Sequence, residues 1–211
     1  MGRACLLFTL LLTNCGYVIA HNVRGIRDVD FKNQTFPFTA HTHIPDLPRR
    51  VRVSNGVYHS AHQEPSMSYT YFKVAEIVVG SLTGDGREEA AVVAIYGGAT
   101  SDYYETSVYV YTIRGHRAKL IAVLNETSVR GQYERFPHGP RSFLFEAVAG
   151  ATRIANERLI VKHFAGGVHC CPPNVFTVQY RLNNRKLLVE SRSLGRKRAS
   201  DDRLRHSWED R

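Results

Sequence analysis

The sequence has no apolar run long enough to cross a membrane as a helix. Its N-terminal run, Ala4–Leu12, is interrupted by Thr9 and is much shorter than the ~20 residues that a bilayer core requires. The run follows Arg3 and precedes the compact residues Val18–Ala20, which is the pattern of a cleavable signal peptide. We therefore expect residues 1–20 to be removed and His21 to begin an exported protein, secreted or periplasmic, with no transmembrane segment.

Cysteine is scarce, which excludes a disulfide framework. Of the 4 cysteines, Cys5 and Cys15 leave with the signal peptide if cleavage follows Ala20, and the adjacent Cys170–Cys171 pair remains. Export places both thiols where they oxidise, so we predict a disulfide between these two neighbours. Cys15 lies in a lipobox-like segment, but Asn14 stands where that motif has Gly, Ala or Ser. Lipid anchoring through Cys15 is therefore the less favoured alternative.

Motifs of the common enzyme classes are missing. There is no Gly-x-Ser-x-Gly elbow, no His-Glu-x-x-His zinc motif and no phosphate-binding glycine loop. The sequence therefore favours a non-catalytic binding or interaction module of the cell envelope or exterior, without a cofactor. The alternative is a thiol- or metal-dependent enzyme in which His163 or His169 activates Cys171. A structural or inhibitory protein without a small ligand also stays open.

The charge is strongly basic, with a formal net charge of +9. This balance favours association with anionic polymers or surfaces, and an exported protein rarely meets nucleic acid. Much of the positive charge lies in residues 191–211, which contain few large apolar side chains. We predict that this tail is disordered or loosely helical, because it can bury too little to offset the entropy of ordering. Carbohydrate and peptide are the other candidate partners.

Alternating apolar residues predict an all-β, antiparallel domain over residues 50–190, after an irregular lead-in at 21–49. Asn55–Gly56 predicts a hairpin turn between Arg50–Val53 and Val57–Tyr58. We expect little helix, beyond one turn within 127–134. The further expected strands are 70–79, 89–96, 106–114, 118–124, 142–148, 157–164, 174–182 and 186–190.

A weak internal repeat relates the two halves of this domain. Residues 89–98 resemble 157–167, and the hairpin that begins at Val108 resembles the one at Val175, an offset of 67 residues (175 − 108). Apolar alternation alone would produce much of this similarity, so duplication and coincidence both stay open. A true duplication predicts two blade-like, four-stranded units packed as a sandwich or split barrel.

Three segments resemble known families. Asp30–Pro37, Gly84–Ala90 and Cys170–Pro172 together resemble a group of small exported bacterial proteins of uncharacterised function. The Gly-Asp-Gly-x-x-Glu-Ala turn also looks like the FG-GAP or VCBS type of β-repeat, and the Cys-Cys-Pro stretch is similar to one in LppP/LprE-type lipoproteins. The resemblance implies export and a β fold, and it carries no established activity.

The candidate binding residues lie in two loops. Cys170 and Cys171 follow His169 in a Gly- and Pro-flanked loop, 166–173, which either binds a ligand or stiffens the chain. If the repeat is real, the loop at 97–104 occupies the same place in the first unit. Its candidate residues are Asp102, Tyr103 and Tyr104.

A metal site is not predicted. Asp85 and Glu89 are the only carboxylates in the ligand register of a calcium-like loop at 81–89, so an ordinary turn is favoured there. The histidines that could bind zinc or copper lack a recognisable third ligand and are taken as surface residues; they are His41, His43, His59 and His62.

Overall fold

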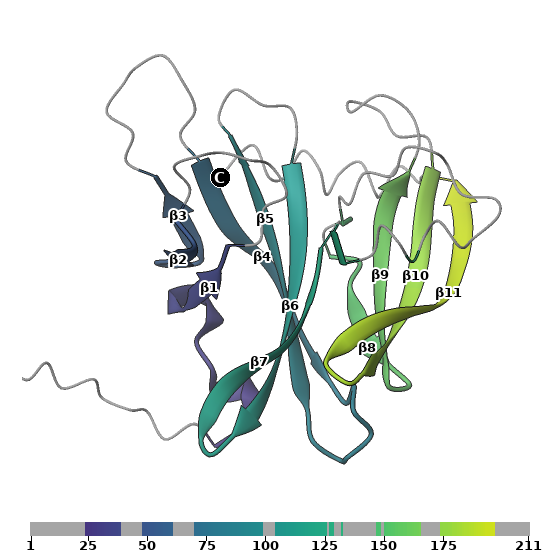
Figure 1. Cartoon of the computed structure of the whole chain (residues 1–211), viewed down its shortest axis with the longest axis horizontal. Coiled ribbons are helices and arrows are strands. Elements are labelled where there is room, and N and C mark those ends of the chain that lie inside the picture. The colour runs from purple at the N-terminus through teal and green to yellow at the C-terminus, as the bar shows by residue number, and fades with distance from the viewer. Residues whose placement is uncertain are drawn as a thin grey trace, which may run out of the picture.

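All the sheets in the part of the protein that the computed structural model describes are antiparallel (Figure 1). That part comprises residues 24–38, 48–60, 70–98, 104–125, 127–128, 132, 147–148, 150–165 and 174–196. Its helical content is small: two 3₁₀ turns, η1 (Ile26–Asp28) and η2 (Phe31–Asn33), and helical residues within 127–132. The predicted all-β class is confirmed. No helix among these residues is long and apolar enough to span a membrane.

The strands form one five-stranded, one four-stranded and one two-stranded sheet. The five-stranded sheet has the order β3 (Val57–His59), β4 (Thr70–Gly80), β5 (Glu89–Gly98), β6 (Tyr104–Arg114) and β7 (Arg117–Leu124). The four-stranded sheet has the order β11 (Lys186–Arg196), β10 (Asn174–Asn183), β9 (Arg158–Ala165) and β8 (Arg153–Ala155). The two-stranded sheet joins β1 (Thr35–Pro37) to β2 (Arg50–Arg52).

Tight turns connect neighbouring strands where the sequence predicts them. The central residues of the turns at 115–116, 156–157 and 184–185 all have positive φ, as two-residue hairpin turns require. Asn55 and Gly56 also have positive φ, at 52° and 85°. The hairpin expected there is wrong, however, because β2 pairs with β1 and β3 pairs with β4. Only the bridge between Ser54 and Val57 links the two sides of the turn.

The five-stranded sheet is buried on both faces. Ala90 and Val92 on β5 and Tyr109 and Tyr111 on β6 share one face, called the front face here. The opposite, back face packs against the four-stranded sheet in a cluster that includes Val93, Val110, Leu159, Val161, Phe176 and Val178. Burial on both faces explains why the sequence of β5 reads as an almost continuous apolar run.

The lead-in forms part of the core, contrary to the irregular segment that the sequence predicts. Ile26, Phe31 and Phe36 are buried against the front face of the five-stranded sheet. The ring of Phe36 lies 5.4 Å from that of Phe72. The domain therefore begins before residue 50.

The two larger sheets are built alike, as a duplication predicts, but in a different register. Ala90 pairs with Tyr111 in one sheet and Leu159 with Tyr180 in the other, and a bulge precedes each tyrosine in the next strand pair. Equivalent positions are therefore 69 residues apart (180 − 111), and the offset of 67 is wrong by two. Tyr111 faces the lead-in, whereas Tyr180 faces the five-stranded sheet.

Two boundaries at the C-terminal side also differ from expectation. The three-residue strand β8 is absent from the expected strands, because it is too short to show alternation. Strand β11 continues to Arg196, so residues 191–196 are paired with β10 rather than belonging to a disordered tail. Of the strand expected at 142–148, only 147–148 are described, and Ala147 forms a single bridge with His163.

Candidate functional site

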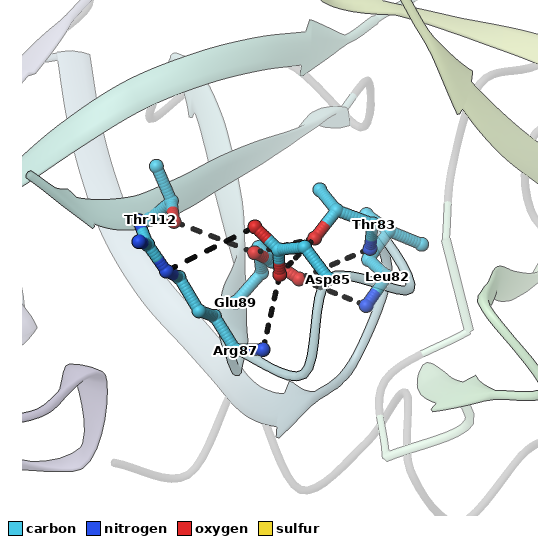
Figure 2. A network of polar contacts seen from close by, with 6 residues as sticks. All are labelled: Leu82, Thr83, Asp85, Arg87, Glu89 and Thr112. Carbon is cyan, nitrogen blue, oxygen red and sulfur yellow. Dashed lines mark hydrogen bonds and ion pairs between the residues drawn. The ribbon is translucent and has the colours of Figure 1, made fainter.

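The loop at 81–88 is held from inside by Glu89, which is fully buried at the start of β5 (Figure 2). Its Oε2 accepts hydrogen bonds from the backbone N–H of Leu82 at 2.8 Å and of Thr83 at 3.3 Å. Its Oε1 accepts from the hydroxyls of Thr83 at 3.2 Å and Thr112 at 3.4 Å. A buried carboxylate with this set of donors acts as an internal cap for the loop.

Asp85 performs a similar task on the exposed side of the same loop. Its Oδ1 accepts from the Thr83 hydroxyl at 2.8 Å and from the Arg87 backbone N–H at 3.0 Å (Figure 2). These bonds, led by the one from Thr83, lower the pKa of Asp85. Thr83 thus links Asp85 and Glu89, the two carboxylates of the calcium candidate. Their oxygens accept hydrogen bonds from N–H and O–H groups of the loop. No group of three or more metal-ligating side chains occurs among the residues that the structure describes.

The same loop is tied to the lead-in by an ion pair. Arg27 of η1 donates from Nε and Nη2 to the two carboxylate oxygens of Glu88, at 2.8 and 2.6 Å. The hydrogen bond from Arg27 lowers the pKa of Glu88. Two-point contact fixes the orientation of the two side chains as well as their distance, so this exposed pair links the loop to the N-terminal segment.

A basic pocket opens where these segments meet. It has a volume of about 450 Å³ and is lined by residues of the lead-in, the 81–88 loop and the β6–β7 hairpin. The 81–88 loop and this hairpin lie at the lower end of the view in Figure 1. The lining residues are Arg24, Gly25, Ile26, Arg87, Glu88, Ile113, Gly115 and His116. Glu88 is the only carboxylate among them, and it is already bonded to Arg27.

His163, a candidate base in the enzyme alternative, lies between the two large sheets. It is fully buried, and its Nε2 is 3.1 Å from the hydroxyl of Tyr180, which is also fully buried. Burial lowers the pKa of His163 to about 3. A neutral imidazole in this position is enclosed in the core and is not exposed to a substrate on the surface.

The predicted binding residues fall mostly outside the described part of the chain. Asp102, Tyr103, His169 and the Cys170–Cys171 pair all do so, and Tyr104 is placed only as the first residue of β6. The strands that flank the two loops nonetheless hold equivalent positions, since β5–β6 and β9–β10 are the corresponding pairs of the two sheets. The candidate ligands His41, His43 and His62 also lie outside, and His59 lies at the end of β3.

Sequence reasoning misses the pocket. Arg87 stands out in the sequence only as part of a turn motif, and His116 only as part of the turn Arg114–Arg117. The available signal is the density of cationic residues in that turn, three of four positions. Nothing in the sequence places Arg24 beside either segment.

Comparison with protein-family models, curated proteins and solved structures gives no match to this chain. The fold and the site define an all-β protein of two stacked sheets with a basic pocket at one end.

Proposed function

We propose that the protein is an exported, non-catalytic binding module that receives its ligand in the basic pocket. The observation that carries the proposal is the pocket itself, which three separate chain segments form and in which the Arg27–Glu88 pair links two of them. A preformed concave site with a few polar groups is the usual form of a ligand site. The expected signal peptide and the resemblance to small exported bacterial proteins support the compartment.

The polar groups of the described chain favour binding over catalysis. Glu89 and Asp85 hold the loop, and Glu76 accepts from the backbone N–H groups of Gly150 and Thr152 at 3.1 and 3.4 Å. His163 is enclosed between the sheets. A general base must reach the proton that it abstracts, so this burial argues against the enzyme that uses His163 with Cys171.

Filling the pocket tests the proposal. A Cβ added at Gly25 meets only Asp28 Oδ2, at 4.0 Å, so the backbone there has room for a first side-chain atom, and Gly25→Phe adds a large side chain to the pocket wall. Gly195→Phe is the matched control, because Gly195 on β11 also has room for a side chain and does not line the pocket.

Both variants and the wild-type protein are immobilised and exposed to an extract of the native envelope, and the retained molecules are identified by mass spectrometry. The wild type and Gly195→Phe should retain the same molecule with unchanged mass, and Gly25→Phe should lose it. Equal retention by all three proteins, or conversion of the retained molecule, would contradict the proposal.

A further inference from the structure

We propose that the ligand of the pocket is a small organic anion: a carboxylate or phosphate group on a compact, partly apolar body. This inference rests on the proposed function, because it names the class of ligand for the same site. It is argued from the charges of the pocket wall, the apolar residues beside them and the volume available.

The cations of the pocket have room for an external anion. Within the described residues, Arg24 forms no hydrogen bond or ion pair. Arg87 lies 4.0 Å from Asp85 through its Nε, which is the outer limit of an ion pair, and both side chains are largely exposed. Arginine binds carboxylate and phosphate oxygens through a planar fork of N–H donors, so two arginines that line one pocket suit such a group.

The only anionic side chain in the lining is neutralised. Arg27 on η1 donates hydrogen bonds to both carboxylate oxygens of Glu88. Arg114 and Arg117 flank the turn that carries His116, and all three are exposed. Five arginines at or beside the pocket outnumber three carboxylates, of which Asp28 accepts from the Gly25 N–H and Asp85 lies beside Arg87. The field at the pocket is therefore positive, and it attracts anions from solution before contact.

The remaining lining favours an organic body over a bare ion. Ile26 is buried at the edge of the front-face core and Ile113 is half-buried. Gly25 and Gly115 leave the walls without side chains at two points. About 450 Å³ is enough for one small molecule and far more than an inorganic phosphate needs.

Calorimetric titration at low salt tests the inference with four probes: glucuronate, glucose 6-phosphate, inorganic phosphate and glucose. We expect the two acidic sugars to bind, inorganic phosphate to bind at least fivefold more weakly than glucose 6-phosphate, and glucose not to bind. Arg24→Gln and Arg87→Gln should each weaken the acidic sugars about tenfold, the effect of one lost charge-assisted contact.

Two further variants separate electrostatics from folding. Glu88→Gln removes the negative charge from the wall and leaves Arg27 in place, so it should tighten binding of the acidic sugars severalfold. Arg153→Gln changes an exposed arginine on β8, outside the pocket, and should leave affinity within twofold. A purely structural role for these residues would not make Glu88→Gln bind more tightly.

The inference is overturned if neither acidic sugar binds, if glucose or inorganic phosphate binds as tightly as glucose 6-phosphate, or if Arg153→Gln weakens binding as much as Arg24→Gln. Failure of the probes alongside capture of an envelope ligand that Gly25→Phe loses would remove only this inference. Conversion of a bound probe would remove the non-catalytic function and leave the anion site standing.

Discussion

Acid should destabilise the fold through one buried side chain, His163. The imidazole is enclosed between the sheets beside the Tyr180 hydroxyl, and desolvation holds its pKa near 3. The perturbation is a pair of variants. Tyr180→Phe keeps the histidine, and the double variant His163→Leu/Tyr180→Phe removes the titrating group together with its hydrogen-bonding partner.

The magnitude follows from the difference between the folded and unfolded pKa values. The ordinary pKa of a histidine side chain is 6.5, and that of His163 in the folded chain is about 3. Between these values the unfolded chain binds a proton that the folded chain does not, so stability falls as pH decreases. On lowering the pH from 7 to 5, this group should cost about 2 kcal/mol of unfolding free energy.

Carboxylates have little influence on the comparison. Hydrogen bonds lower the pKa values of Asp85 and Glu88, which shifts stability in the same direction as His163 does, but equally in both variants. Burial raises the pKa of Glu76, which shifts stability in the opposite direction, but equally in both variants. The difference between the variants therefore isolates His163.

Urea denaturation followed by far-ultraviolet circular dichroism at pH 7 and pH 5 measures the effect. Tyr180→Phe should lose about 2 kcal/mol more on acidification than the double variant does. An equal loss in the two proteins, within about 0.5 kcal/mol, would refute the buried neutral histidine as the acid-sensitive group.

Three other predictions concern the buried carboxylate of the 81–88 loop, the end of β11 and the cysteine pair. Glu89→Ala should lower the unfolding free energy by about 3 kcal/mol or more in urea, because it leaves buried N–H donors without an acceptor, whereas the exposed Glu88→Gln should change it little. Truncation after Arg196 should keep the melting temperature within a few degrees, but truncation after Glu190 removes the paired end of β11 and should lower it by about 10 °C. The Cys170–Cys171 pair should give a two-dalton mass deficit and no alkylation before reduction, and full labelling would exclude the disulfide.

Much of the fold is predictable because its long strands alternate or are buried on both faces. Strands β4 to β7 and β9 to β11 all lie where apolar residues recur between turn residues. The lead-in is not predictable in this way, because β1 and the two 3₁₀ turns are each three residues long. Segments this short show no period, and their burial depends on a sheet that lies later in the chain.

The register of the repeat cannot be found from apolar alternation. Offsets of 67 and 69 residues have the same parity, so both superimpose apolar positions on apolar positions. Hydrogen bonding decides between them, since the turns at 115–116 and 184–185 and the bulges before Tyr111 and Tyr180 all agree on 69. The candidate site is missed for a related reason: its three segments meet only in the folded chain.

The position of the pocket follows from how the layers stack. The lead-in covers the front face of the five-stranded sheet, and that sheet covers the equivalent face of the four-stranded one. Between the five-stranded and four-stranded sheets, the 81–88 loop fills one end of the interface. Leu82 is buried in the core there, and a Cβ at Gly84 would lie 2.7 Å from Glu157 Oε1. Between the lead-in and the five-stranded sheet, the corresponding end of the interface is bounded by Arg24–Ile26 and forms the basic pocket. The pocket therefore opens at the interface where a short segment of the lead-in, rather than a whole sheet, covers the sheet beneath it.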